Sequence, residues 1–369
     1  MKTLGLYIHI PFCIKKCLYC DFNSYESAFS KERAYFDALF SEIERKSALY
    51  KNYACDSVYI GGGTPTAVKT ENIEKLIKVL KKNFNITVDA EINIECNPKT
   101  AGKEDFLKLK NAGINRVSIG VQSLDDEVLK RLGRIHSASD AVKCLSDARL
   151  AGFFNISCDL MFALPGQELR LWEETLYKTI EQNPAHISCY ALKIEENTPF
   201  YHMDLKLPAE EEEAKMYERA VKILAENGYM RYEISNFAKE GKQSRHNLKY
   251  WSLMPYLGLG AGAYSSIDGE RFKNPASLDE YIKGEDKKED YILLSKEELM
   301  SEYMFMGLRK TDGVSEEEFL KRFGESIFEH FEKPLKKYLS GGILHEKNGR
   351  IYLNEKMFYI SNIIFCDFV

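Results

Sequence analysis

Hydrophobic positions repeat with two different periods along the first half of the chain. Runs rich in β-branched and aromatic residues predict strands at 4–10, 57–60, 88–96, 116–120, 155–159 and 186–192. Between them, apolar residues recur at helical spacing, and helices are expected at 31–50, 71–82, 103–111, 170–182 and in two segments before residue 150. This alternation predicts a parallel sheet with right-handed crossovers. About six units are fewer than the eight of a closed barrel, so we expect an α/β fold, an open, partial (β/α)6 TIM-like barrel.

The pattern becomes irregular after a charged helix expected near 209–227. A strand is expected at 232–235 and a charged linker at 284–290. Three helices and a hairpin then predict a C-terminal winged-helix-like domain, with helices at 296–309, 315–323 and 325–339 and hairpin strands at 343–345 and 351–353 around Asn348-Gly349. Its helices are acidic, so we expect this domain to pack against the barrel and not to read DNA. The predicted regions are 1–230, 231–290 and 291–369.

Composition excludes several classes of protein. The 369 residues are 44% hydrophobic and 29% charged, as in soluble globular proteins, and the net charge of -5 argues against broad nucleic-acid binding. No apolar run is long enough for a membrane span, and the first residues make a poor signal peptide. The 9 cysteines, an odd number, fit a reducing compartment better than a disulfide scaffold. We therefore expect a cytoplasmic protein without nucleic-acid partners.

Three of these cysteines form a C-x3-C-x2-C array after the first strand, namely Cys13, Cys17 and Cys20. Thiolates are the ligands that iron–sulfur clusters select. A four-iron cluster held by three cysteines keeps one iron open for another ligand. Chance packing of three core cysteines is disfavoured, because Lys15 and Lys16 make the loop polar.

With Tyr19 before the third cysteine, this array resembles the cluster loop of the radical S-adenosylmethionine superfamily. The resemblance implies a [4Fe–4S] cluster whose open iron binds S-adenosylmethionine. Gly61 to Pro65 reads GGGTP after the next strand, which is also compatible with a simple tight turn. A phosphate loop is disfavoured, because the Lys-Ser/Thr end of that motif is missing. The glycines resemble the superfamily's GGE-type motif, where backbone carbonyls approach the methionyl ammonium.

Four polar residues lie at or near predicted strand ends: Glu95, Gln122, Arg134 and Asp159. Individually each is more often a cap or a surface ion-pair partner. Together they suit a zwitterionic nucleoside, with arginine for the carboxylate, aspartate and glutamine for ribose hydroxyls, and glutamate for the ammonium. Their contexts, IECNP, GVQS, LGRIH and CDLMFALPG, resemble the coproporphyrinogen dehydrogenase (HemN) family. That resemblance implies further nucleotide-site residues: Tyr7, Tyr19, Gly62, Gly63, Thr64 and Ala191.

Two departures from the dehydrogenase favour its heme-chaperone relatives, the HemW branch. The first cysteine is already Cys13, whereas the dehydrogenase has a long arm before its cluster loop. Phe22 also replaces a further cysteine of the dehydrogenase. Residues 246–251, HNLKYW, match the H-N-x-x-Y-W pattern of the HemW branch. Here His246 offers an imidazole to heme iron; the alternative, a solvent-exposed loop histidine, remains open.

The resemblance therefore implies a chaperone that binds the cluster, S-adenosylmethionine and heme and passes heme to an acceptor protein. It also implies an electron donor for the cluster and allows transient membrane association with the acceptor. No catalytic residue is assigned, and whether the protein is an enzyme stays open. The alternatives are an oxygen-independent coproporphyrinogen III dehydrogenase of porphyrin biosynthesis and a structural iron–sulfur protein.

Overall fold

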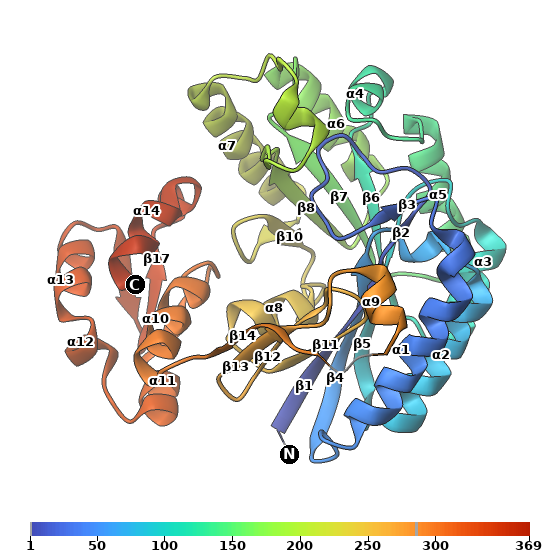
Figure 1. Ribbon diagram of the computed structural model, residues 1–369. Helices are drawn as coiled ribbons and strands as arrows, with labels where there is room; N and C mark the ends of the chain where they lie inside the picture. The colour runs from blue at the N-terminus through green and yellow to red at the C-terminus, as the bar shows by residue number, and fades with distance from the viewer. Residues whose placement is uncertain (1, 285–286) are drawn as a thin grey trace.

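The computed structural model describes residues 2–284 and 287–369 (Figure 1). Within them, one 12-stranded sheet has the order β14-β13-β12-β11-β1-β4-β5-β6-β7-β8-β10-β9. Its central six strands are parallel, which confirms the open (β/α)6 arrangement. They are β1 (Lys2–Ile10), β4 (Tyr53–Gly62), β5 (Ile86–Cys96), β6 (Arg116–Gln122), β7 (Ile156–Phe162) and β8 (His186–Ala191).

Helices cover the outer face of this curved sheet, as Figure 1 shows. Strand residues facing them are apolar: in β1, Leu4, Leu6 and Ile8 are all fully buried. Burial of each such side chain stabilises the fold by about 2 kcal/mol. The covering helices are α1 (Glu32–Ser47), α2 (Thr70–Asn83), α3 (Lys103–Ala112), α5 (Ala138–Leu150), α6 (Leu169–Glu181) and α7 (Glu210–Glu226). The short helix α4 (Asp126–Arg131) packs instead in a separate apolar cluster, through Val128.

The inner face of the same strands is polar. Successive side chains of a strand point to opposite faces, so β5 alternates buried Ile92 and Ile94 with Glu91, Asn93 and Glu95. The neighbouring strands repeat this alternation with Arg116 and Ser118 on β6, Ser157 and Asp159 on β7, and His186 and Ser188 on β8. The concave face of the sheet is therefore lined by polar side chains, which can bind a polar ligand.

The segment after α7 differs from the sequence-based expectation. The strand predicted at 232–235 is wrong: Glu233 makes only an isolated bridge to Lys310, and the strands lie on either side, as β9 (Met230–Arg231) and β10 (Asn236–Ala238). The region containing HNLKYW, predicted as irregular, forms helix α8 (Arg245–Trp251). The Ser244 hydroxyl caps it by accepting a hydrogen bond from the Asn247 backbone N–H.

Further strands extend the sheet beyond β1. Strand β11 (Tyr256–Leu259) pairs with β1 in parallel, and β12 (Tyr264–Ile267), β13 (Glu270–Lys273) and β14 (Glu289–Leu293) follow antiparallel. Part of the predicted linker 284–290 thus belongs to β14, and residues 285–286 lie outside the described residues. Strands β2 (Phe12–Cys13) and β3 (Tyr25–Glu26) form a separate two-stranded sheet after β1. Helix α9 (Leu278–Ile282) lies between β13 and β14 in the chain.

The C-terminal domain combines helices with a three-stranded sheet of order β15-β17-β16. Its hairpin turns at Asn348 and Gly349, whose φ values of 54° and 69° suit the expected Asn-Gly turn. The single helix expected at 325–339 is divided at Phe331, where ψ is 35°. The domain contains α10 (Lys296–Gly307), β15 (Val314–Ser315), α11 (Glu316–Phe323), α12 (Ile327–His330), α13 (Glu332–Ser340), β16 (Leu344–Lys347), β17 (Arg350–Leu353) and α14 (Ser361–Phe365).

This domain packs against the barrel near α8, as expected. The Arg322 guanidinium donates to the Ser252 carbonyl at 3.1 Å, and Arg309 lies over the Trp251 ring at 4.7 Å. Short 3-10 turns complete the chain: η1 (Phe29–Lys31), η2 (Pro65–Ala67), η3 (Pro199–His202), η4 (Glu355–Ile360) and η5 (Cys366–Phe368). Among the described residues, no helix has the length and apolar character needed to cross a membrane.

Candidate functional site

A cavity of about 360 Å³ opens on the inner face of the sheet. Most of the site residues expected from the sequence line it together: Cys13, Cys17, Tyr19, Cys20, Gly62, Gly63, Thr64, Glu95, Gln122, Arg134 and Asp159. Tyr7, Ala191 and His246 are not among its lining residues. The carboxyl ends of parallel strands meet at this edge, which explains why residues far apart in sequence converge here.

The cysteine loop lies over the mouth of this cavity. Its two ends are held together because β2 pairs in parallel with β3. Within the loop, the Cys20 N–H donates to the Cys17 carbonyl at 3.2 Å. Burial raises the pKa of the Cys20 thiol to about 11 and also raises the pKa of Cys13. Metal binding at these thiols would therefore release protons.

The donor chemistry of this loop fits an iron–sulfur cluster. Three thiols line one cavity edge, and Lys15 and Lys16 stand beside them to balance thiolate charge. Among the described residues, no three His, Cys, Asp or Glu side chains converge on a single metal ion. A cubane does not need such convergence, because each cysteine binds a different iron.

The glycine motif brings the end of β4 against the first cysteine. A Cβ on Gly63 would lie 2.8 Å from the Phe12 carbonyl oxygen and 3.0 Å from the Cys13 sulfur, so only glycine allows this approach. Thr64 follows, with its hydroxyl oxygen 3.6 Å from the same sulfur. The Asn97 amide already donates to that oxygen at 2.8 Å, which leaves the hydroxyl proton for Cys13.

Arg134 connects the cysteine loop with the cavity wall. One terminal nitrogen donates to the Cys17 sulfur at 3.3 Å, and the other donates to Asn97 Oδ1 at 2.8 Å and to the Gly120 carbonyl at 2.7 Å. Within the described residues its buried Nε–H has no hydrogen-bond partner. A guanidinium held in this way presents a fixed cation at the cavity wall, as a ligand carboxylate requires.

Glu95 lies across the cavity at the end of β5. The Tyr59 hydroxyl donates to one carboxylate oxygen at 2.7 Å, and the Gly62 N–H donates to the other at 3.1 Å. Burial raises the pKa of this carboxyl group to about 7. A cationic ligand would restore the ionised form, because an opposite charge favours it.

Asp159 accepts hydrogen bonds from serine hydroxyls on three strands: Ser118 at 2.7 Å, Ser188 at 2.9 Å and Ser157 at 3.2 Å. Burial raises the pKa of this carboxyl group, and the hydroxyls oppose that rise. A carboxylate offers about four acceptor positions, so one remains for a ligand hydroxyl.

Gln122 ends β6 with a φ of 63°, a left-handed conformation that costs on the order of 1 kcal/mol and is typical of functional sites.

Two of the expected nucleotide residues lie outside the cavity lining. The Tyr7 hydroxyl bonds His9 Nδ1 at 2.9 Å, and its ring stacks on Tyr59 at 6.2 Å between centroids. Tyr7 therefore supports a cavity residue from behind. His9 bonds the Asn23 carbonyl through Nε2 at 2.7 Å, so both of its ring nitrogens have partners within the fold. Ala191 ends β8 and packs against the core.

His246 is completely buried, so the alternative of a solvent-exposed loop histidine is wrong. Its Nδ1 bonds the Ser57 hydroxyl at 2.9 Å and its Nε2 bonds the Tyr250 hydroxyl at 2.9 Å. Burial lowers its pKa to about 3. Both ring nitrogens are thus engaged, and iron ligation by His246 would require α8 to release the imidazole.

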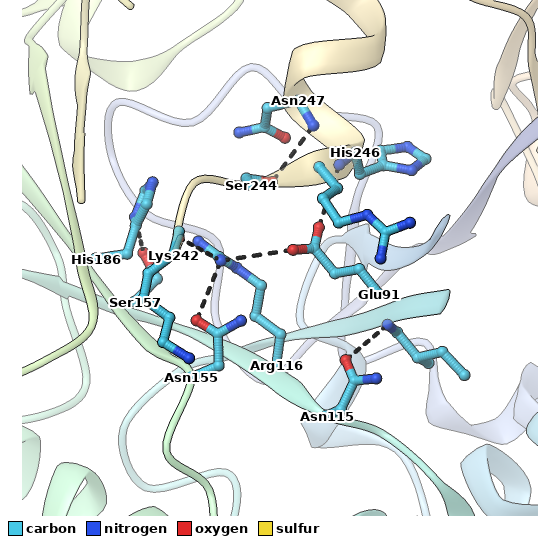
Figure 2. Close-up of polar contacts among 12 residues, drawn as sticks. Glu91, Asn115, Arg116, Asn155, Ser157, His186, Lys242, Ser244, His246 and Asn247 are labelled. Carbon is cyan, nitrogen blue, oxygen red and sulfur yellow. Dashed lines mark hydrogen bonds and ion pairs between the residues drawn. The ribbon is translucent and has the colours of Figure 1, made fainter. Parts of the chain in front are cut away.

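Sequence reasoning missed the floor of the cavity, which lies toward the amino ends of the strands. Arg116 there donates to Asn155 Oδ1 at 3.2 Å and to the Lys242 carbonyl at 3.0 Å, and it pairs with Glu91 at 3.6 Å (Figure 2). Asn93 is 1% exposed, and neither amide atom has a partner among the described residues. The alternation of polar and apolar residues within β5 was the signal that could have identified this floor.

The rim of the cavity carries both apolar and cationic groups. Phe22 is 62% exposed and Tyr190 is 40% exposed, and both line the cavity with Lys15, Lys16 and Lys193. Lys193 pairs with Glu195 at 2.6 Å. Behind the cavity wall, the Cys96 sulfur lies 3.9 Å from the buried Cys144 sulfur.

Comparison with known proteins agrees with this geometry. The family model described as the Radical SAM superfamily matches residues 7–177, and the HemN C-terminal domain matches residues 294–357. The chain is 38% identical to the heme chaperone HemW of Bacillus subtilis, over 98% of both chains. It is 34% identical to the heme chaperone HemW of Lactococcus lactis, over 100% of this chain and 98% of that protein.

A solved structure shares the whole fold. Coproporphyrinogen III oxidase (HemN) from Escherichia coli, described as a radical SAM enzyme, superposes with a TM-score of 0.88. The match covers 100% of this chain and 90% of that chain at 24% identity. At this identity the similarity establishes the fold, and function must be argued from the site.

Proposed function

Because the chain belongs to the HemW family of radical S-adenosylmethionine proteins, we propose that it is a heme chaperone. In this proposal it binds a [4Fe–4S] cluster, S-adenosylmethionine and heme, and passes heme to an acceptor protein. The observation that carries the proposal is the common cavity, in which the three-cysteine loop faces Glu95, Arg134 and Asp159.

Cys13, Cys17 and Cys20 would hold the cluster. Three thiols leave one iron of a four-iron cluster without a protein ligand, and Arg134 stands beside this loop. The cluster supplies an electron for reductive chemistry when it is bound. An external electron donor would have to reach the loop, which lies at the cavity mouth.

S-adenosylmethionine would fill the cavity between the cysteine loop and the floor. Arg134 would bind its carboxylate, Glu95 its ammonium group, and Asp159 together with Gln122 its ribose. The fixed guanidinium, the carboxyl group with a pKa near 7 and the remaining acceptor position of Asp159 support these roles. Gly62, Gly63, Thr64 and Tyr19 would shape the nucleotide pocket, which Tyr7 and Ala191 do not line.

Heme would bind at the rim of the cavity. A heme has a flat apolar macrocycle with two propionates, and the rim offers the exposed Phe22 ring with Lys15 and Lys16 beside it. The second location is α8, where His246 would ligate iron after leaving Ser57 and Tyr250. We favour the rim, because it is accessible without rearrangement.

The partners follow from this role. Heme transfer needs an acceptor protein, and the exposed rim is where heme could pass between two proteins. The cysteines form no disulfide among the described residues, which fits the proposed cytoplasmic location.

The proposal is tested on protein reconstituted anaerobically with iron and sulfide. It should bind S-adenosylmethionine and heme and should load a heme-free acceptor. Supplied with coproporphyrinogen III, S-adenosylmethionine and reductant, it should form no protoporphyrinogen IX. Formation of that product would overturn the chaperone assignment in favour of the dehydrogenase.

A further inference from the structure

A chain of buried hydrogen bonds runs from Asp159 along the cavity wall, which His186 and Ser244 also line, to helix α8. Ser157 Oγ lies 3.2 Å from Asp159 and 2.7 Å from His186 Nδ1, as Figure 2 shows for the second contact. His186 Nε2 lies 2.8 Å from the Tyr232 hydroxyl. That hydroxyl accepts the Ser244 N–H at 3.2 Å, and Ser244 caps α8.

The direction of every proton in this chain can be deduced from its two ends. Ser244 N–H can only donate, so the Tyr232 oxygen accepts from it. Within the described residues the only other contact of the Tyr232 hydroxyl is His186, so its proton must go to Nε2 or remain buried and unpaired. His186 Nε2 is therefore an acceptor, and a neutral imidazole then carries its proton on Nδ1.

The other end of the chain gives the same answer. An ionised Asp159 only accepts, so the single hydroxyl proton of Ser157 is best used toward the carboxylate. Ser157 then has a lone pair free for the Nδ1–H of His186 at 2.7 Å. Both ends of the chain thus favour the same tautomer, with each donor pointing toward Asp159.

We infer that His186 and Tyr232 are positioning residues for Asp159, acting through Ser157 with His186 in its Nδ1–H tautomer. This inference rests on the proposed role of Asp159 in binding the ribose of S-adenosylmethionine. The chain fixes the carboxylate so that its remaining acceptor position faces the ligand. His186 and Tyr232 are 1% and 8% exposed, so both donors are largely shielded from bulk solvent.

The same tyrosine connects the cavity with the rest of the molecule. Its backbone carbonyl accepts the Thr311 N–H at 3.0 Å, from the loop that follows α10 in the C-terminal domain. Its hydroxyl serves the cap of α8. Tyr232 thus contacts His186, the cap of α8 and the C-terminal domain at the same time.

The tautomer is tested first on the protein without cofactors, with 15N-labelled histidine and NMR spectra that distinguish protonated from bare ring nitrogens. His186 should carry its proton on Nδ1, and Tyr232→Phe should shift it toward Nε2. An Nε2–H tautomer in the unchanged protein would overturn the inference. This measurement needs no S-adenosylmethionine, so it is independent of the proposed function.

Binding is tested on reconstituted protein. Tyr232→Phe should weaken S-adenosylmethionine binding about fivefold, the effect of one hydrogen bond. Tyr229→Phe is the matched control, because its buried hydroxyl donates to the Pro184 carbonyl at 2.9 Å and is not part of the chain. His186→Asn should recover part of the affinity lost in His186→Leu, since its amide can donate to Ser157. Equal affinities for both tyrosine variants would overturn the inference, whereas a failure of the unchanged protein to bind S-adenosylmethionine would instead overturn the proposed function.

Discussion

The guanidinium of Arg134 lies 3.3 Å from the sulfur of Cys17, although 117 residues separate the two in sequence. Arg134 also donates to the Gly120 carbonyl on β6. The same guanidinium therefore connects the cysteine loop to the parallel sheet. One side chain therefore contacts both a proposed cluster ligand and the wall of the cavity in which S-adenosylmethionine is proposed to bind.

We predict that Arg134→Met weakens S-adenosylmethionine binding about tenfold or more, because the ligand carboxylate loses a charge-assisted hydrogen bond. The three cysteines remain, so iron content should stay near that of the unchanged protein. Calorimetric titration and iron analysis measure the two effects. Arg131→Met is the control, since Arg131 bonds the Pro165 carbonyl and does not contact the loop. Unchanged affinity in Arg134→Met would refute the assigned role.

Gly63 provides a steric test of the cluster loop. Gly63→Ala should displace Cys13 and lower the iron content, because the new Cβ would stand 2.8 Å from the Phe12 carbonyl and 3.0 Å from the Cys13 sulfur. Such overpacking costs about 1–3 kcal/mol. Gly102→Ala is the control, because its nearest contact would be at 3.9 Å. Normal iron content in Gly63→Ala would contradict the placement of the loop.

Glu95 should make the stability of the cofactor-free protein depend on pH. Its pKa of about 7 in the folded state lies above the ordinary value of 4.5, because burial disfavours the charged form. The folded state therefore binds the Glu95 proton more tightly than the unfolded state does. The contribution of protonated Glu95 to the free energy of unfolding is present below about pH 4.5 and is lost as pH rises through about 7. We expect a loss of about 3 kcal/mol across this window, absent in Glu95→Gln. Denaturant unfolding at several pH values measures it, and identical profiles would refute the shift.

Heme titration separates the two proposed heme locations. If heme binds at the rim, reversing the charges of Lys15 and Lys16 to Glu should weaken binding about tenfold through repulsion of the propionates. His246→Ala should then leave the heme spectrum unchanged. Lys103→Glu serves as a control for charge alone, since this exposed residue begins α3. A heme spectrum lost only in His246→Ala would instead place the iron at α8.

The barrel could be predicted because each of its strands and helices is indicated by the residues of its own segment. Each parallel strand is a short apolar run, and each covering helix has its own periodicity, so the six units were predicted correctly. The expected convergence is observed, because Glu95, Gln122 and Asp159 line one cavity, although Asp159 lies within β7 and not at its end.

The parts that were missed depend on distant partners. Strand β11 exists because β1 accepts it some 250 residues away in sequence, with Gly5 opposite Tyr256. The burial of His246 on α8 likewise depends on a distant partner, Ser57 of β4. The cavity floor was not predicted, because serine and asparagine within a strand do not by themselves indicate a binding site. Only the alternation of side chains along the strand assigns them to the inner face.

The central claim is a cubane with one iron open to S-adenosylmethionine, and electron paramagnetic resonance of the reduced, reconstituted protein tests it most directly. Addition of S-adenosylmethionine should change the cluster signal, since the ligand binds the open iron. Cys17→Ser should lose the cubane, whereas Cys366→Ser, which changes an exposed cysteine, should keep it. A normal cubane in Cys17→Ser, or a signal unaffected by S-adenosylmethionine, would contradict the account.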